Sequence, residues 1–347
     1  MKLSFVSTRS ISDAMRYQML RMQSDLAKAD KELSTGRLAD VGVVLGVRTS
    51  QSVSLARDLD RLNGLVDSNA AIASRLSASQ QALEQLGSVA QDFFAAITAN
   101  SSSGTDPSVL QAEARDALQT MVGILNSSLN GEYLFSGINT DVKPLNVYEA
   151  GSPGKTAFDA AFLGHFGFTQ TDPAASGITE ANMQTFLDTQ VAPLYTGAAW
   201  QSGWSNATDQ RIVSRITLNE TVETSVSANI SGIQKLANAA ATVQELLQGQ
   251  LNGATQDVVV QSAFKLVGEA IADLTREQAE LGIVQTRVTS ASDRIKLQVD
   301  LFTNNIRDLE GVDPYEVSTR ISSLMTQIET SYTLTARIQQ LSLVRYL

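Results

Sequence analysis

Few residues of this sequence have the types and spacing that catalysis requires. The best match to a phosphate-binding loop is Gly151-Ser152-Pro153-Gly154-Lys155-Thr156. Such a loop needs a glycine at position 149, where Glu149 stands, and Pro153 lacks a backbone N–H that would bind phosphate. We therefore interpret residues 151–156 as a turn rather than as a nucleotide site.

Acid–base and metal chemistry have equally little support. His165 is the only histidine, and the sequence contains no cysteine. One histidine without partners supplies neither a zinc site nor a nucleophile–base pair, and the lack of cysteine excludes thiolate nucleophiles and disulfides. Glu149 and Asp159, which lie near aromatic residues, are the acids that stand out as a pair for glycosidase-like catalysis. We favour solvated acids over a catalytic pair and expect no catalytic, cofactor-binding or metal-binding residues.

Charge and hydropathy exclude two classes of partner. The net charge is −10, whereas a nucleic-acid-binding protein needs a basic surface to neutralise phosphates. No apolar run is long enough to cross a bilayer, and residues 1–10 lack the apolar segment of a cleavable secretory signal. We expect no nucleic acid partner and no membrane insertion. A cytoplasmic protein and a protein exported with uncleaved ends both fit these features.

The prolines divide the chain into regions of different character. None of the six lies in residues 1–106 or 194–313, so we expect long uninterrupted helices there. Residues 142–214 hold four prolines, both tryptophans and many glycines. This composition predicts a compact β-rich or mixed domain. Alternating apolar residues after it predict a β-hairpin near residues 211–226.

Heptad-like spacing at both ends of the chain predicts helices that pair along an apolar seam. Apolar residues recur at alternating steps of four and three before position 34, and a second series follows Asp313-Pro314, which would cap the last helix. We expect the two ends to pair, to stay mobile in the monomer and to become ordered on assembly. The predicted assembly interface comprises Met15, Met19, Met22, Leu26, Leu33, Ile321, Leu324, Ile328, Tyr332, Ile338, Leu341 and Leu347.

These patterns predict a mainly α fold with a nested domain plan. Long terminal helices would form a coiled-coil or helical-bundle rod, with the β-rich or mixed domain inserted in the middle of the chain. Residues 1–44 and 312–347 would form a terminal coiled-coil assembly region. Residues 45–141 and 215–311 would form a helical rod domain that carries the hairpin, and residues 142–214 would face outward.

Three motifs resemble the flagellin family. Lys31-Glu32-Leu33-Ser34-Thr35-Gly36 is similar to the stretch that ends the first helix of a flagellin. Residues 131–137 (Gly-Glu-Tyr-Leu-Phe-Ser-Gly) and residues 331–347 resemble the branch of this family that joins the hook to the filament. The resemblance covers roughly residues 1–141 and 215–347 and departs from the family pattern at Leu38-Ala39-Asp40 and at residues 4–8.

The resemblance implies a structural subunit of the extracellular bacterial flagellum with no enzyme activity and no cofactor. Its partners would be hook-associated protein 1, flagellin, and other copies of itself in a ring. It also implies type III export through the flagellar export apparatus with the help of a chaperone, and without a cleaved signal peptide. The terminal helices would form the inner layer of the assembly.

Three alternatives remain beside this interpretation. A filament-forming flagellin would share the same terminal helices. An enzyme or binding activity could be carried by the insertion 142–214. A cytoplasmic coiled-coil signalling protein is a third alternative, against which the low charge beside the seam and the glycine-rich break at residues 36–46 argue.

Overall fold

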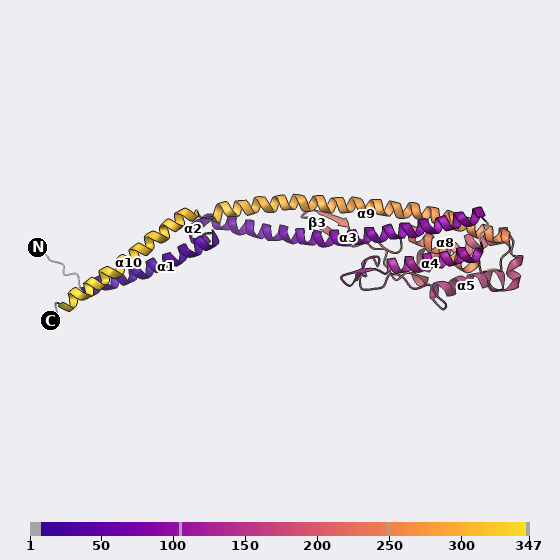
Figure 1. Cartoon of the computed structure of the whole chain (residues 1–347), viewed down its shortest axis with the longest axis horizontal. Helices are drawn as coiled ribbons and strands as arrows, with labels where there is room; N and C mark the ends of the chain where they lie inside the picture. The colour runs from indigo at the N-terminus through magenta and orange to yellow at the C-terminus, as the bar shows by residue number, and fades with distance from the viewer. Residues whose placement is uncertain (1–7, 104–105, 249, 345–347) are drawn as a thin grey trace. The chain divides into compact units, whose positions relative to one another are not determined.

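The computed structural model describes residues 8–103, 106–248 and 250–344 (Figure 1), and the side chains of 10–100, 106–248 and 250–337 within them. The chain divides into two compact units, residues 1–64 with 295–347 and residues 65–294. Most of the described part is helical, and its strands form two small two-stranded sheets. The predicted mainly α fold with long terminal helices is confirmed.

The first unit is built on two long helices, α1 (Thr8–Thr35) and α10 (Pro314–Val344), which pack against each other. Between them in sequence come α2 (Val41–Leu45) and the 3-10 helix η1 (Gly46–Arg48). The unit also contains the first turns of α3 (Thr49–Ser103) and the last turns of α9 (Gly253–Glu310). Asp313 caps α10 as predicted, since its Oδ1 accepts a hydrogen bond from the Tyr315 N–H at 2.8 Å.

The second unit packs α4 (Pro107–Leu125) and α8 (Ser231–Leu246) against each other, with the rest of α3 and α9. Its core is continuous, and α3, α4, α8 and α9 all contribute fully buried apolar side chains to it. The unit also contains two β-hairpins. The first joins β1 (Ser128–Leu129) to β2 (Glu132–Tyr133), and Asn130 and Gly131 at its turn both have positive φ.

The second hairpin joins β3 (Val213–Thr217) to β4 (Glu220–Glu223), within the stretch where sequence alternation predicts one. Side chains of the helices fasten it to the unit. Asn69 of α3 is fully buried and donates a hydrogen bond from Nδ2 to the Ile216 carbonyl at 2.9 Å. Arg287 of α9 pairs with Glu220 at 2.9 Å. The hairpin therefore ties α3 to α9 within this unit.

The insertion is largely helical, whereas its composition predicts a β-rich or mixed domain. It consists of α5 (Pro153–Phe166), η2 (Pro173–Gly177), α6 (Glu180–Phe186), the π-helix η3 (Leu187–Val191), η4 (Ala192–Tyr195) and α7 (Gly197–Gly203). Its described strand pairing is limited to the start of β3 and an isolated bridge between Leu145 and Ser205.

The positions of two prolines explain why the insertion is helical and not β-rich. Pro153 and Pro173 lie in the first turn of α5 and η2, directly after the capping residues Ser152 and Asp172. Proline is favoured there because the first N–H groups of a helix have no partner within the helix. Prolines also fit the turns of the β-rich or mixed domain that the composition predicts, but in the structure these two begin helices.

The compact units divide within α3 and α9, at 64/65 and 294/295. The boundaries expected at 44/45 and 311/312, together with the outward orientation of the insertion, therefore stay predictions.

Candidate functional site

The two terminal helices bring most of the predicted assembly residues onto one seam. Met22 is buried against α10, and Met15, Met19 and Leu26 are half-buried. On α10 the corresponding residues are Ile321, Leu324 and Ile328, which are also half-buried. Leu33 and Tyr332 lie at the margin of the seam, 41% and 53% exposed. The side chains of Ile338 and Leu341, and the whole of Leu347, lie outside the described residues.

Polar contacts along the seam show that α1 and α10 run antiparallel. Gln23 donates a hydrogen bond from Nε2 to the Tyr332 hydroxyl at 3.1 Å. Nearer the start of α10, Arg320 donates to the Glu32 carboxylate at 2.8 Å. Both pairs join residues about three hundred positions apart in the sequence. The heptad pattern predicted the helices and their seam, but it could not predict these partners.

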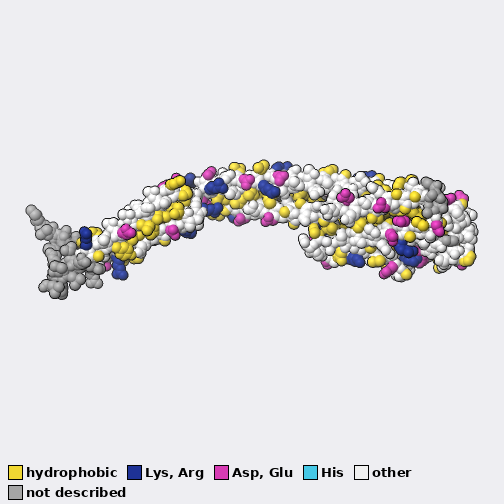
Figure 2. All heavy atoms as spheres, viewed as in Figure 1, with side chains coloured by type: hydrophobic (Ala, Val, Ile, Leu, Met, Phe, Trp, Pro, Cys, Tyr) yellow, Lys and Arg dark blue, Asp and Glu magenta, His cyan; other side chains and the backbone are white. Residues whose placement is uncertain are grey.

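Large apolar residues outside the seam are also exposed on the two helices, and apolar side chains gather along the visible face of the pair (Figure 2). Tyr17 and Leu20 of α1 are 76% and 60% exposed. They lie roughly half a helical turn from Met15 and Met22 around the axis of α1. Met325 and Leu334 of α10 are also exposed. Two helices cannot cover all of this apolar surface, so the pair offers it to further helices.

A groove runs beside the seam on the surface of α10. Its volume is about 530 Å³, and the α1 residues Gln18 and Met22 form part of its lining. The remaining lining comes from small hydroxyl or amide residues and one leucine of α10, namely Ser323, Thr326, Gln327, Thr330, Ser331 and Leu334. No lining side chain carries a charge, so a ridge of apolar side chains could pack there without burying an unpaired charge.

Two buried carboxylates, those of Glu32 and Glu310, bind residues of neighbouring helices and of the loop after α1 in the first unit. Glu32 accepts hydrogen bonds from Arg320 and from the Ala39 backbone N–H, at 2.8 and 3.1 Å. Glu310 pairs with Arg37 at 3.6 Å and accepts a hydrogen bond from the Ser52 hydroxyl. Sequence analysis missed both roles, although Glu32 lies within the motif at residues 31–36.

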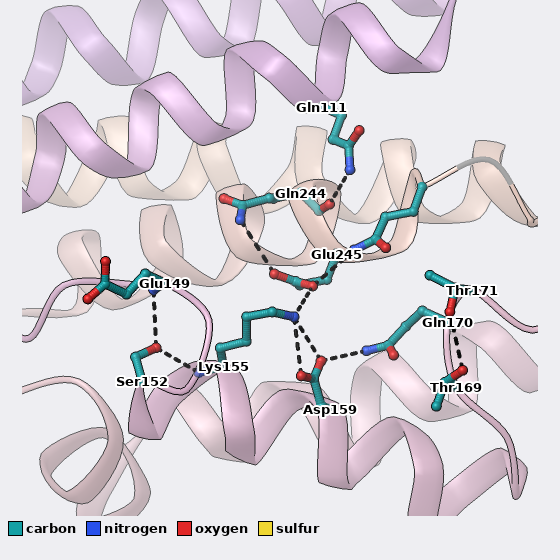
Figure 3. Close-up of polar contacts among 11 residues, drawn as sticks. Gln111, Glu149, Ser152, Lys155, Asp159, Thr169, Gln170, Thr171, Gln244 and Glu245 are labelled. Atoms are coloured by element: carbon teal, nitrogen blue, oxygen red, sulfur yellow. Dashed lines mark hydrogen bonds and ion pairs between the residues drawn. The ribbon is translucent and has the colours of Figure 1, made fainter.

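Lys155 and Asp159 of the insertion form a structural ion-pair cluster with Glu245 of α8 (Figure 3). Lys155 Nζ contacts Asp159 at 3.0 Å on α5 and Glu245 at 2.7 Å on α8. Gln170 Nε2 donates to Asp159 at 2.9 Å. The Glu245 side chain is only 2% exposed, so the lysine supplies the charge that makes its burial tolerable.

This cluster perturbs the ionisation of its members. Burial lowers the pKa of Lys155, but the hydrogen bonds and charges of Glu245 and Asp159 outweigh it and raise that pKa above its ordinary value. Burial, with the charge of Glu245, raises the pKa of the Tyr195 hydroxyl well above its usual value. The lysine is held protonated and fully engaged, which is unsuitable for a base or a nucleophile.

The phosphate-loop-like stretch is the beginning of a helix. The Ser152 hydroxyl accepts hydrogen bonds from the Lys155 and Glu149 N–H groups, at 3.4 and 3.2 Å. His165 is exposed and its ring packs against Phe166 and Phe186. Within the described side chains, no group of three or more His, Asp and Glu residues is arranged to hold a metal ion. The candidate functional site is therefore the surface of the terminal helix pair.

Two family models match this chain at the positions of its long helices. The N-terminal helical region of bacterial flagellin matches residues 6–140, and the C-terminal helical region matches residues 264–347. Together they cover well over half of the chain. The chain belongs to the flagellin family. It is therefore a structural component of the extracellular bacterial flagellum, and it interacts with other flagellar components.

One solved structure of a flagellar protein shares this fold. A structure assigned as a flagellar hook-associated protein from Vibrio parahaemolyticus is 12% identical, with a TM-score of 0.52 over 76% of this chain and 97% of that chain. FlgL from Bacillus cereus is 10% identical, with a TM-score of 0.49 over 73% of this chain and 99% of that chain. No curated protein sequence matches the flagellin-family chain. Within its described residues, no helix is long and apolar enough to cross a membrane.

Proposed function

We propose that this flagellin-family chain is a hook–filament junction subunit of the hook-associated protein 3 type. It would join hook-associated protein 1 to the first flagellin subunits, as one of several copies in a ring. The observation that carries the proposal is the apolar surface left uncovered on the α1–α10 pair. Tyr17 and Leu20 remain largely exposed on the side of α1 opposite the seam, and most of the described seam residues are themselves only half-buried. Such surface is stabilised only when neighbouring subunits cover it.

The motif at residues 131–137 supports the junction role over a filament role. Leu134 and Phe135 are buried, and the Phe135 carbonyl accepts a hydrogen bond from the Ala228 N–H at 2.7 Å. Arg75 of α3 donates to Glu132 and to the Tyr133 carbonyl, both at 2.8 Å. The motif that resembles the junction branch therefore anchors the start of the insertion on the long helices.

The assembly interface would be heterologous, with different surfaces of the terminal pair meeting in neighbouring copies. The projecting side chains of Tyr17 and Leu20 on α1 suit the uncharged groove on α10. A head-to-tail contact of this kind closes into a ring when the rotation between copies is right. Met15, Met22, Ile321 and the other seam residues would hold the pair in the shape that the neighbour meets.

Location within the flagellum tests the proposal directly. Because the sequence has no cysteine, His165→Cys on the exposed face of α5 gives a single thiol for a gold or fluorescent label. We expect the label only at the boundary between hook and filament when isolated flagella are imaged. Label along the whole filament would support the filament-forming flagellin instead, and flagella without label would overturn the structural assignment of this chain to the junction.

A bulk assay separates the same two alternatives. Purified chain exposed to polymerising salt should give short aggregates or none, whereas a filament-forming flagellin should give long filaments. A variant that ends before Tyr332 should stay a soluble monomer and fail to join the flagellum, because it lacks half of the α10 seam. Normal incorporation of that variant would contradict the proposed interface.

A further inference from the structure

The tripeptide Leu-Asn-Gly occurs three times in this chain, and the structure places each occurrence in a different setting. The three occupy residues 62–64, 129–131 and 251–253. An asparagine followed by glycine is prone to deamidation, because glycine has no Cβ to hinder attack of its backbone nitrogen on the asparagine side chain. Since the three asparagines have the same residue on either side, the fold decides which of them reacts.

The first asparagine lies inside a helix. Asn63 and Gly64 are exposed, but both lie well within α3. The helical backbone fixes the dihedral angles around Asn63, and the Gly64 N–H points along the helix toward the carbonyl group one turn earlier. The Gly64 nitrogen must leave this geometry before it can reach the Asn63 side chain, so the helix slows the attack.

The third asparagine is held by hydrogen bonds. Nδ2 of Asn252 donates to the carbonyl groups of Ser176 and Ile178, each at 2.9 Å. Its Oδ1 accepts hydrogen bonds from the Thr255 N–H and the Thr255 hydroxyl, at 3.0 and 3.1 Å. Asn252 therefore acts as the cap of α9. Its amide carbon cannot turn toward the Gly253 nitrogen without breaking several of these bonds.

The second asparagine has neither form of protection. Asn130 and Gly131 form the exposed turn of the β1–β2 hairpin, with φ values of 53° and 87°. In the described part of the chain, no other residue hydrogen-bonds the Asn130 side chain. The hairpin consists of only two residue pairs. Little backbone pairing therefore opposes the rotation that brings the Gly131 nitrogen to the Asn130 side chain.

We propose that Asn130 is a site of spontaneous deamidation. The backbone nitrogen of Gly131 attacks Cγ of Asn130, the side-chain amide leaves as ammonia with the proton of that nitrogen, and a cyclic succinimide forms. Water then opens the ring at either of its carbonyl groups, which leaves aspartate or isoaspartate at position 130. The reaction needs no enzyme, cofactor or oxidant, and it does not depend on the junction role proposed above.

The two products affect the hairpin differently. Aspartate fits the same turn, since Asp-Gly is favoured at two-residue hairpin turns. Isoaspartate routes the main chain through the side-chain carbon and adds one methylene group to the turn, so the pairing of Leu129 with Glu132 cannot be kept. Arg75 of α3, which donates to Glu132 and to the Tyr133 carbonyl, then loses a fixed pair of acceptors. Isoaspartate formation therefore loosens the contact between this hairpin and α3.

Incubation of the purified full chain in mildly alkaline buffer, followed by peptide mapping with mass spectrometry, tests the site. We expect Asn130 to deamidate first and to give both products. Asn63 and Asn252 should react at least about tenfold more slowly, because attack there must first break hydrogen bonds. In the urea-unfolded chain all three should react at similar rates. Loss of Asn130 no faster than that of Asn63 or Asn252 in the folded chain, or an equal lead of Asn130 in urea, would each overturn the proposal.

Two variants test the consequence for the hairpin, with amide exchange over residues 128–133 measured before and after the same incubation. Exchange should rise in the wild type and stay unchanged in Asn130→Gln, whose longer side chain closes a ring far more slowly. Fresh Asn130→Asp carries the new charge without the added methylene group and should exchange like the fresh wild type. An equal change in the wild type and Asn130→Gln would contradict the proposed loosening by isoaspartate.

Discussion

The terminal helix pair and the insertion bury their large apolar side chains to very different extents. In the insertion, Phe158, Phe162 and Trp200 are completely buried. In the terminal pair, Leu324 and Ile328 are only half-buried, although they lie on a regular heptad seam. The contrast teaches that periodicity makes a helix pair, whereas the number of surrounding elements decides whether that pair is stable alone. Two helices leave most of the described seam residues open on their flanks.

The largest effect is expected from the aromatic core of the insertion. Phe162→Ala removes a fully buried ring that contacts Phe166 and Phe186, at centroid distances of 4.7 and 5.4 Å. Such a deletion costs about 3–5 kcal/mol of unfolding free energy because it leaves a cavity. Urea unfolding monitored by the fluorescence of Trp200 and Trp204 measures it. Leu163→Ala, at a half-exposed position of the same helix, is the control and should lose under about 1 kcal/mol.

The next effect is expected from the ion pair between α5 and α8. Glu245→Gln removes the carboxylate and leaves Lys155 with Asp159 alone. Breaking a buried pair costs roughly 3–5 kcal/mol, and this pair falls toward the lower figure because Lys155 keeps one partner and is partly exposed. The same unfolding measurement applies. Glu149→Gln, which changes an exposed acid nearby, should leave stability unchanged; an equal loss from both variants would contradict the role of the cluster.

Leu324→Ala in the terminal pair should separate folding from assembly. Because Leu324 is half-exposed, its truncation should lower monomer stability by only about 1 kcal/mol. The same change should prevent incorporation into the flagellum, since the seam shapes the surface that neighbours meet. Flagellar incorporation in cells and unfolding of the purified monomer give the two readouts. If the Leu324→Ala monomer unfolded but was still incorporated into the flagellum, the result would contradict our claim that this seam matters more for assembly than for folding.

The smallest effect concerns a partly exposed ion pair of the second unit. Hydrogen bonding from Lys235 lowers the pKa of Asp273 below its usual value. A lowered folded-state pKa gives stability that is present above the unfolded pKa and is lost as the pH falls through the folded one. Solvent screening limits this contribution to under about 1 kcal/mol. Asp273→Asn should therefore flatten the stability profile between neutral and acidic pH and leave little difference at the acidic end.

Local sequence patterns predicted much of this fold because the features concerned are local. Heptad spacing placed the seam of α1 and α10, alternation placed the β3–β4 hairpin, and Asp313-Pro314 marked the start of α10. The insertion was harder, since its prolines fit a turn or the first turn of a helix equally well. Only the capping bonds of Ser152 and Asp172 distinguish the two.

The sequence predicts which apolar residues lie on the terminal helices of the candidate site, but it does not predict the long-range contacts between them. The apolar residues of the interface follow from periodicity, but the contacts of Glu32 with Arg320 and of Glu310 with Ser52 join distant parts of the chain. No local pattern encodes such pairs. The groove on α10 likewise depends on how its small residues lie beside Met22 of α1. These features depend on how distant parts of the chain pack together.

Hydrogen–deuterium exchange tests the central claim most directly, because it reports the stability of each helix separately. In isolated monomer we expect fast exchange over residues 10–35 and 314–337, and slow exchange over the α4 and α8 core of the second unit. In isolated flagella the same terminal helices should exchange slowly. Strong protection of α1 and α10 in the isolated monomer would contradict the claim that neighbouring subunits complete this surface.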